Sequence, residues 1–85
     1  MVFKIIFADE VVYQLKKIDN KTAKRVLDKI ESTINDPTHF FERLVEREDY
    51  KLRIGDYRVI ARVFQNEKTI FILSFGHRKN IYKKK

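Results

Sequence analysis

The sequence has no cysteine, only two histidines and no long apolar run. Without cysteine the chain can form neither a disulfide nor a thiolate metal site, which is typical of a cytoplasmic protein. His39 and His77 are far apart and lack ligand spacing, so we expect neither a metal nor a small-molecule cofactor. No apolar stretch approaches transmembrane length, and the N-terminal MVFKIIFADE becomes acidic too soon for a signal peptide. These absences predict a soluble cytoplasmic domain without a membrane partner.

The 85 residues, 44% of them hydrophobic, are enough for one domain with a small core, spanning 1–85. Their charge is uneven. Residues 1–49 contain 9 Lys/Arg and 10 Asp/Glu, a net charge of −1, whereas residues 50–85 contain 10 and 2, a net charge of +8. A balanced half joined to a strongly basic half indicates a polyanionic partner on one surface. A solvated basic face kept for solubility is the alternative that charge alone leaves open.

Apolar spacing in the first half predicts a strand followed by two helices. Residues 2–7, VFKIIF, favour a short strand. Apolar residues then recur at helical spacing in residues 11–18, with Val12 beside them, and from about Lys21 to Ile34, with Leu27 among them. Asp19-Asn20 separates the two helices and offers an N-cap for the second, which Asn35-Asp36-Pro37 ends. The pair forms an antiparallel helical hairpin with one apolar side. A polar connection follows, whose Phe40, Phe41, Leu44 and Val45 are expected to cover the core edge.

The second half begins with a β-hairpin. Residues 50–54 and 57–64 flank Gly55-Asp56, a two-residue loop with glycine first, as in a type II′ turn. This turn places Arg53 opposite Arg58, a repulsive cross-strand pair. Since side chains alternate, Leu52, Ile54 and Val59 belong to a core face, and the other face carries Lys51, Arg53, Arg58 and Arg62. Clustered cations on a solvent face favour a bound anion that neutralises them.

A third strand and a basic terminus complete the chain. Residues 69–76, TIFILSFG, are almost continuously apolar, which predicts an interior strand. A tight loop over 65–68 would place Phe75 beside Arg58 and Phe71 beside Arg62. Such rings could stack on bases, or could pack beneath a terminal segment. The final GHRKNIYKKK adds five Lys/Arg and no acid where this strand ends.

The order of a strand, a helical hairpin, K-L-R-x-G-D-Y-R-V-I, a further strand and G-H-R-x-x-x-Y resembles the RelE/ParE superfamily of toxins. The resemblance spans nearly the whole chain and is closer to the RelE branch, whose members cleave messenger RNA in the ribosomal A site. It implies an α+β fold in which a small antiparallel β-sheet packs on the N-terminal helical hairpin. It also implies a type II toxin that inhibits translation as a metal-independent endoribonuclease, using the 2′-hydroxyl of the RNA.

The matching motifs carry candidate roles to residues of this sequence. By this resemblance the catalytic residues are Lys51, Arg58, Arg78 and Tyr82, and the RNA-binding residues are Arg53, Arg62, His77 and Lys79. Guanidinium groups suit a phosphate because their fork matches its oxygens. We expect Arg58 to bind the scissile phosphate and Arg78 to assist the leaving group. Either Lys51 or Tyr82 removes the 2′ proton, and Tyr82 stacks or shuttles a proton.

Two departures from the family pattern leave the general base open. Some RelE enzymes have a lysine where this chain has Asp49, and others use a histidine that His77 matches only loosely. The partners that the resemblance implies are the ribosome, mRNA and a RelB-like antitoxin whose acidic or amphipathic helices cover the sheet and the helical hairpin. Two other functions stay open. One is a ParE-like toxin that inhibits DNA gyrase, and the other is a non-catalytic basic module that binds nucleic acid or an acidic helix.

Overall fold

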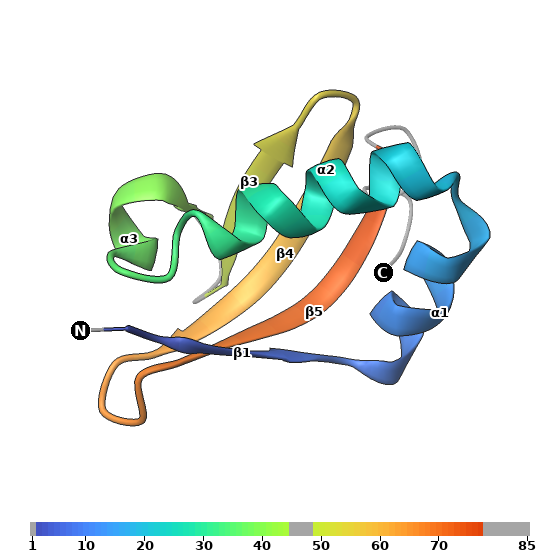
Figure 1. The fold of residues 1–85 in the computed structure, drawn as a ribbon. Helices are drawn as coiled ribbons and strands as arrows, with labels where there is room; N and C mark the ends of the chain where they lie inside the picture. The colour runs from blue at the N-terminus through green and yellow to red at the C-terminus, as the bar shows by residue number, and fades with distance from the viewer. Residues whose placement is uncertain (1, 45–48, 78–85) are drawn as a thin grey trace.

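The protein is a five-stranded sheet with its helices on one face, as seen in a computed structural model that describes residues 2–44 and 49–77 (Figure 1). The strand order is β1-β5-β4-β3-β2. In chain order the elements are β1 (Lys4–Phe7), α1 (Asp9–Lys17), α2 (Asn20–Glu31), α3 (Pro37–Phe40), β2 (Glu42–Arg43), β3 (Tyr50–Ile54), β4 (Tyr57–Phe64) and β5 (Thr69–His77). The predicted α+β class and its N-terminal helical pair are confirmed.

The sheet is mixed, where the sequence predicted an antiparallel one. β1 pairs with β5 in parallel, from Lys4↔Thr69 to Phe7↔Ile72, and the other strand pairs are antiparallel. A parallel pair requires a long crossover, and the chain between these two strands contains the helices and the hairpin that provide it. β5 lies between β1 and β4, so its predicted interior position is confirmed.

Both predicted helices form, and α2 begins at its predicted cap. The Asp19 carboxylate accepts hydrogen bonds from the Thr22 backbone N–H at 3.0 Å and from the Thr22 hydroxyl at 2.7 Å. α2 ends at Glu31, before the predicted Ile34, because the Thr33 backbone N–H and hydroxyl both turn back to the carbonyl of Ile30. No helix within the described ranges is long and apolar enough to cross a membrane.

The core lies between the helices and the sheet. Val11 of α1 and Val26 and Ile30 of α2 are at most 1% exposed, and they pack with the apolar side chains of one face of β3, β4 and β5. Val12 and Leu27 belong to the predicted apolar stripes but are 39% and 41% exposed. A short helix on a flat sheet buries only its innermost stripe, which leaves residues at the edge of that stripe in contact with solvent.

The connection before the hairpin is more ordered than its polarity predicted. It forms the short helix α3 and the strand β2, which pairs Glu42 with Lys51 and Arg43 with Tyr50. Phe41 is 4% exposed and covers the core edge as expected, whereas Phe40 is 47% exposed. Val45 lies outside the described residues.

The cap of α2 gives a pH-dependent contribution to stability. The hydrogen bonds from the Thr22 side chain and backbone lower the pKa of Asp19 below its ordinary value of 3.8. Because the folded-state pKa is depressed, the stabilisation is present above the unfolded pKa and is lost as the pH falls through the folded pKa. We therefore expect Asp19→Ala to lower the urea midpoint at about pH 7 and to do so much less at about pH 3.

Asp19→Asn is the matched control, since it keeps the cap acceptor but does not titrate. At neutral pH its urea midpoint should lie between those of the wild type and Asp19→Ala, because the amide keeps the hydrogen bonds but not the contribution of the charged carboxylate. An Asp19→Ala difference that stays equal at both pH values would contradict the assignment.

Candidate nucleic-acid interface

The β3–β4 hairpin has the predicted register. Arg53 faces Arg58, with Ile54↔Tyr57 and Leu52↔Val59 on either side of that pair. Gly55, the first residue of the turn, has a φ of +60°, which a glycine adopts without strain. The two-residue turn therefore sets which side chains share a face.

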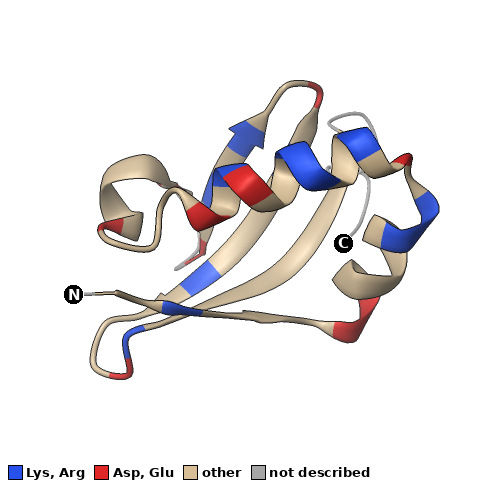
Figure 2. Cartoon of the chain, in the orientation of Figure 1, with Lys and Arg blue, Asp and Glu red and all other residues tan. Residues whose placement is uncertain are grey.

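The two faces of the hairpin differ completely in chemistry. Leu52, Ile54, Val59 and Ala61 point to the helices and are at most 5% exposed. Alternation places the cations on the opposite side of the sheet, which we call the basic face, defined by Lys51, Arg53, Arg58 and Arg62. Figure 2 shows blue Lys and Arg segments on the ribbons of β3 and β4. Arg53 is exposed, while Lys51 and Arg58 are half-buried. Adjacent guanidinium groups on this face can bind one phosphate together, and the negative charge of the phosphate then reduces the repulsion between them.

A β-bulge in β5 makes part of its pairing with β4 differ from the predicted register. Ala61 pairs with Ile72 but Ile60 pairs with Ser74, so Leu73 is an extra residue in β5. Phe71 lies opposite Arg62 as predicted. The predicted pairing of Phe75 with Arg58 is wrong, because the register arithmetic assumed an unbroken ladder and the bulge shifts the later pairs by one residue.

The bulge moves one aromatic ring off the basic face and puts a glycine there. Phe75 is 3% exposed on the helix side, where it stacks on Tyr57 with ring centroids 5.1 Å apart. It therefore cannot stack on a base. Gly76 takes its place opposite Arg58 and contributes no side chain to the basic face.

The structure does not bring His77 to the basic face. His77 pairs with Tyr57, and their rings meet edge to face at 5.7 Å on the helix side. There it lines a small cavity of about 270 Å³ together with residues of α1, among them Gln14 and Lys17. Three other predicted site residues, Arg78, Lys79 and Tyr82, lie outside the described residues.

Lys51 has an acidic neighbour that sequence reasoning missed. Its Nζ lies 3.8 Å from Oε1 of Glu42 across the β2–β3 pair, and its side chain is 18% exposed. The sequence pattern indicated only arginines near Lys51, because a two-residue strand such as β2 has no periodic pattern. Glu42 therefore places an exposed negative charge beside the cations at this edge of the basic face.

Arg62 is held by a buried acid, Asp49. Its Nη2 and Nε lie 2.8 Å and 2.9 Å from Oδ1 of Asp49, a carboxylate that is 1% exposed. The backbone carbonyl of Asp49 also accepts a hydrogen bond from Leu44 N at 3.0 Å. The sequence does contain the information for this ion pair. When the hairpin register is extended by one pair beyond Tyr50↔Ala61, Asp49 lies opposite Arg62. One edge of the Arg62 guanidinium is therefore occupied by the ion pair with Asp49.

Removing Arg62 should destabilise the protein. Arg62→Ala leaves the Asp49 carboxylate buried without its guanidinium partner, and we expect a loss of about 2–3 kcal/mol in the free energy of unfolding. Arg53→Ala is the control, because Arg53 is exposed and its removal relieves a like-charge pair, with an expected change within about 0.5 kcal/mol. Urea denaturation measures both variants. Equal losses of stability in the two variants would contradict the assignment of a structural role to Arg62 and not to Arg53.

Comparisons with known proteins identify the family of this chain. A family model described as the ParE toxin of the type II toxin–antitoxin system parDE matches residues 5–82. The candidate toxin RelE4 of Methanocaldococcus jannaschii is 33% identical over 79 residues, covering 91% of this chain and 84% of that protein.

Solved structures share the fold. The toxin–antitoxin complex RelBE2 of Mycobacterium tuberculosis matches with a TM-score of 0.83 at 20% identity, over 92% of this chain and 100% of the matched chain. The RelE–RelB complex of Pyrococcus horikoshii matches with a TM-score of 0.76 at 25% identity, over 94% and 99% of the two chains. The chain therefore belongs to the RelE/ParE family and is a RelE-like toxin of a type II toxin–antitoxin system.

Proposed function

We propose that this toxin is a ribosome-dependent endoribonuclease that cleaves mRNA in the A site and so inhibits translation. The observation that carries the proposal is the Arg53–Arg58 pair on the basic face, with Lys51 beside it. These two guanidinium groups form a like-charge cross-strand pair. A bound phosphate would turn this repulsion into charge-assisted hydrogen bonds. The 33% identity to RelE4, a candidate toxin of the RelE branch, supports this reading.

The proposed reaction uses the RNA's own 2′-hydroxyl. Its oxygen attacks the neighbouring phosphorus, the bond from phosphorus to the 5′-oxygen breaks, and the leaving oxygen takes up a proton. Arg58 binds the scissile phosphate and stabilises the charge that develops on it, a task that suits a half-buried guanidinium. Lys51, whose Nζ lies 3.8 Å from Oε1 of Glu42, keeps its predicted candidacy for accepting the 2′ proton. Arg78 and Tyr82 keep their predicted roles at the leaving group and in proton transfer.

A RelB-like antitoxin is the proposed partner outside the ribosome. The Pyrococcus horikoshii relative was solved as a RelE–RelB complex. On this chain, Val2, Ile6 and Phe64 are 65%, 44% and 39% exposed, an unusual set of large apolar side chains on a small protein. Ile6 and Phe64 lie on the same sheet face as Arg62, so an amphipathic antitoxin segment could cover apolar and basic side chains together.

Inhibition of DNA gyrase is a second candidate, favoured by the description of the matching family model as a ParE toxin. Two assays in vitro distinguish gyrase inhibition from mRNA cleavage. We expect the purified toxin to leave gyrase supercoiling unchanged and to produce a toeprint at the A site of programmed ribosomes. Loss of supercoiling without a toeprint would favour the ParE-like activity.

Arg58 is the residue that tests the proposed cleavage. We expect Arg58→Ala to lower the rate of A-site cleavage by about 10²–10³-fold, as the loss of one electrostatic stabiliser of the transition state does elsewhere. The measurement is the rate at which new 5′ ends appear on mRNA bound to ribosomes.

Lys16→Ala is the matched control, since it removes an exposed cation from the last turn of α1 and should cleave like the wild type. Equal urea midpoints for the two variants would exclude unfolding as the cause. An Arg58→Ala variant that cleaves as fast as the wild type would refute the assignment.

A further inference from the structure

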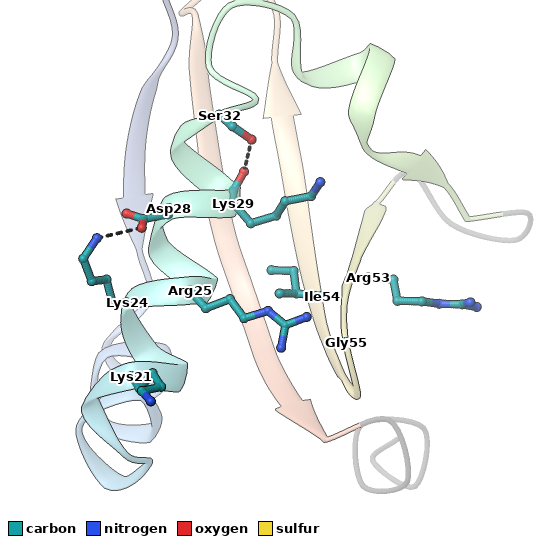
Figure 3. Close-up of a pocket in the computed structure, with 9 residues that line it drawn as sticks. All are labelled: Lys21, Lys24, Arg25, Asp28, Lys29, Ser32, Arg53, Ile54 and Gly55. Carbon is teal, nitrogen blue, oxygen red and sulfur yellow. Dashed lines mark hydrogen bonds and ion pairs between the residues drawn. The ribbon is translucent and has the colours of Figure 1, made fainter.

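A second basic surface lies on the helical side of the hairpin tip. It is a cleft of about 660 Å³ between α2 and β3, which we call the α2 cleft (Figure 3). Five of the residues that line it are cations and one is acidic: Lys21, Lys24, Arg25, Lys29 and Arg53, against Asp28. All of these side chains are exposed. Of the described residues with proposed catalytic roles, neither Lys51 nor Arg58 lines this cleft.

The cations of α2 form a regular row. Lys21, Arg25 and Lys29 are four residues apart, so they lie on one side of the helix at steps of about 6 Å along its axis. Like charges at this spacing weaken a helix. The acid of the cleft does not neutralise the row, because Asp28 is 2.8 Å from Lys24. Figure 3 shows Lys24 reaching towards Asp28, whereas Arg25 and Lys29 extend from the helix towards the hairpin.

The turn of the hairpin is shaped to accept Arg25. A Cβ at Gly55 would lie 3.3 Å from Nη2 of Arg25, closer than most side chains approach. The glycine that the positive φ requires thus also lets the guanidinium lie against the hairpin tip. A cation is in this way held between the helix and the edge of β3.

We propose that the α2 cleft binds the phosphate backbone of an RNA strand that continues from the basic face around the hairpin tip. This inference rests on the proposed function. Arg53 connects the two surfaces, because it belongs to the basic face and also lines the cleft. Among the described residues β2 pairs only with Tyr50 and Lys51, so the tip of the hairpin extends beyond β2. An extended RNA strand can cross the hairpin at this tip.

The lining of the cleft favours RNA over an acidic protein segment. An amphipathic helix needs apolar anchors in its groove. The apolar side chain that lines the α2 cleft is Ile54, and it is only 5% exposed. A phosphate backbone needs no such anchor, and regularly spaced cations bind it without reading the bases.

The test compares two double variants of the full-length toxin. Arg25→Ala/Lys29→Ala removes two cations of the cleft, and Lys16→Ala/Lys17→Ala removes two exposed cations of α1, away from the basic face and the cleft. Fluorescence anisotropy over a range of salt concentrations gives the affinity of each for oligouridine. Losing two phosphate contacts should reduce the slope of log K against log salt by about 1.4 for a single strand. We expect this change in the cleft variant, whereas the control keeps the wild-type slope.

Two results would overturn the inference. One is equal slopes for the cleft variant and the wild type. The other is a cleft variant that retains oligouridine binding but loses binding of polyglutamate, which would assign the cleft to an acidic protein. A-site cleavage by the wild type, measured in parallel, reports on the proposed function separately. Failure of the RNA slope to change would leave cleavage at Arg58 standing.

Discussion

The two-residue turn at Gly55 is the constraint on which the candidate interface depends. Its positive φ sets the register of β3 and β4, and the register sets Arg53 opposite Arg58. A slip of one residue would carry every cation of the hairpin to the core face. Because α1 and α2 cover the apolar face, the basic face is left uncovered by helices among the described residues (Figure 1). The same glycine admits Arg25 to the hairpin tip, so a single backbone requirement positions cations on both sides of β3.

The bulge at Leu73 is the second constraint, and it decides which side chains of β5 lie on the core side of the sheet and which on the basic face. Before the bulge, Phe71 lies beside Arg62 on the basic face. After it, Phe75 stacks on Tyr57 in the core and Gly76 lies beside Arg58. The cations divide in a similar way. Arg62 is tied to the buried Asp49, whereas Arg53 stays exposed to solvent. A row of four cations is therefore not four equivalent RNA contacts.

Local signals in the sequence predicted much of this arrangement. The cap at Asp19, the two helices and the hairpin register each follow from a few neighbouring residues, and all are confirmed. What could not be predicted depends on contacts between distant segments or on very short elements. The parallel direction of β1, the two-residue β2 and the bulge at Leu73 have no periodic pattern of their own. The fold class was thus accessible from sequence, but the side of the sheet that His77 occupies was not.

The central claim is that RNA lies on the basic face with its scissile phosphate at Arg58. A structure of the toxin bound to a ribosome that carries mRNA in the A site tests this most directly. The account predicts that a phosphate of the A-site codon contacts the Arg58 guanidinium, next to Gly76, and that the strand passes Arg53 at the hairpin. An mRNA that contacts only the helical side of the sheet, or a toxin bound away from the A-site codon, would contradict it.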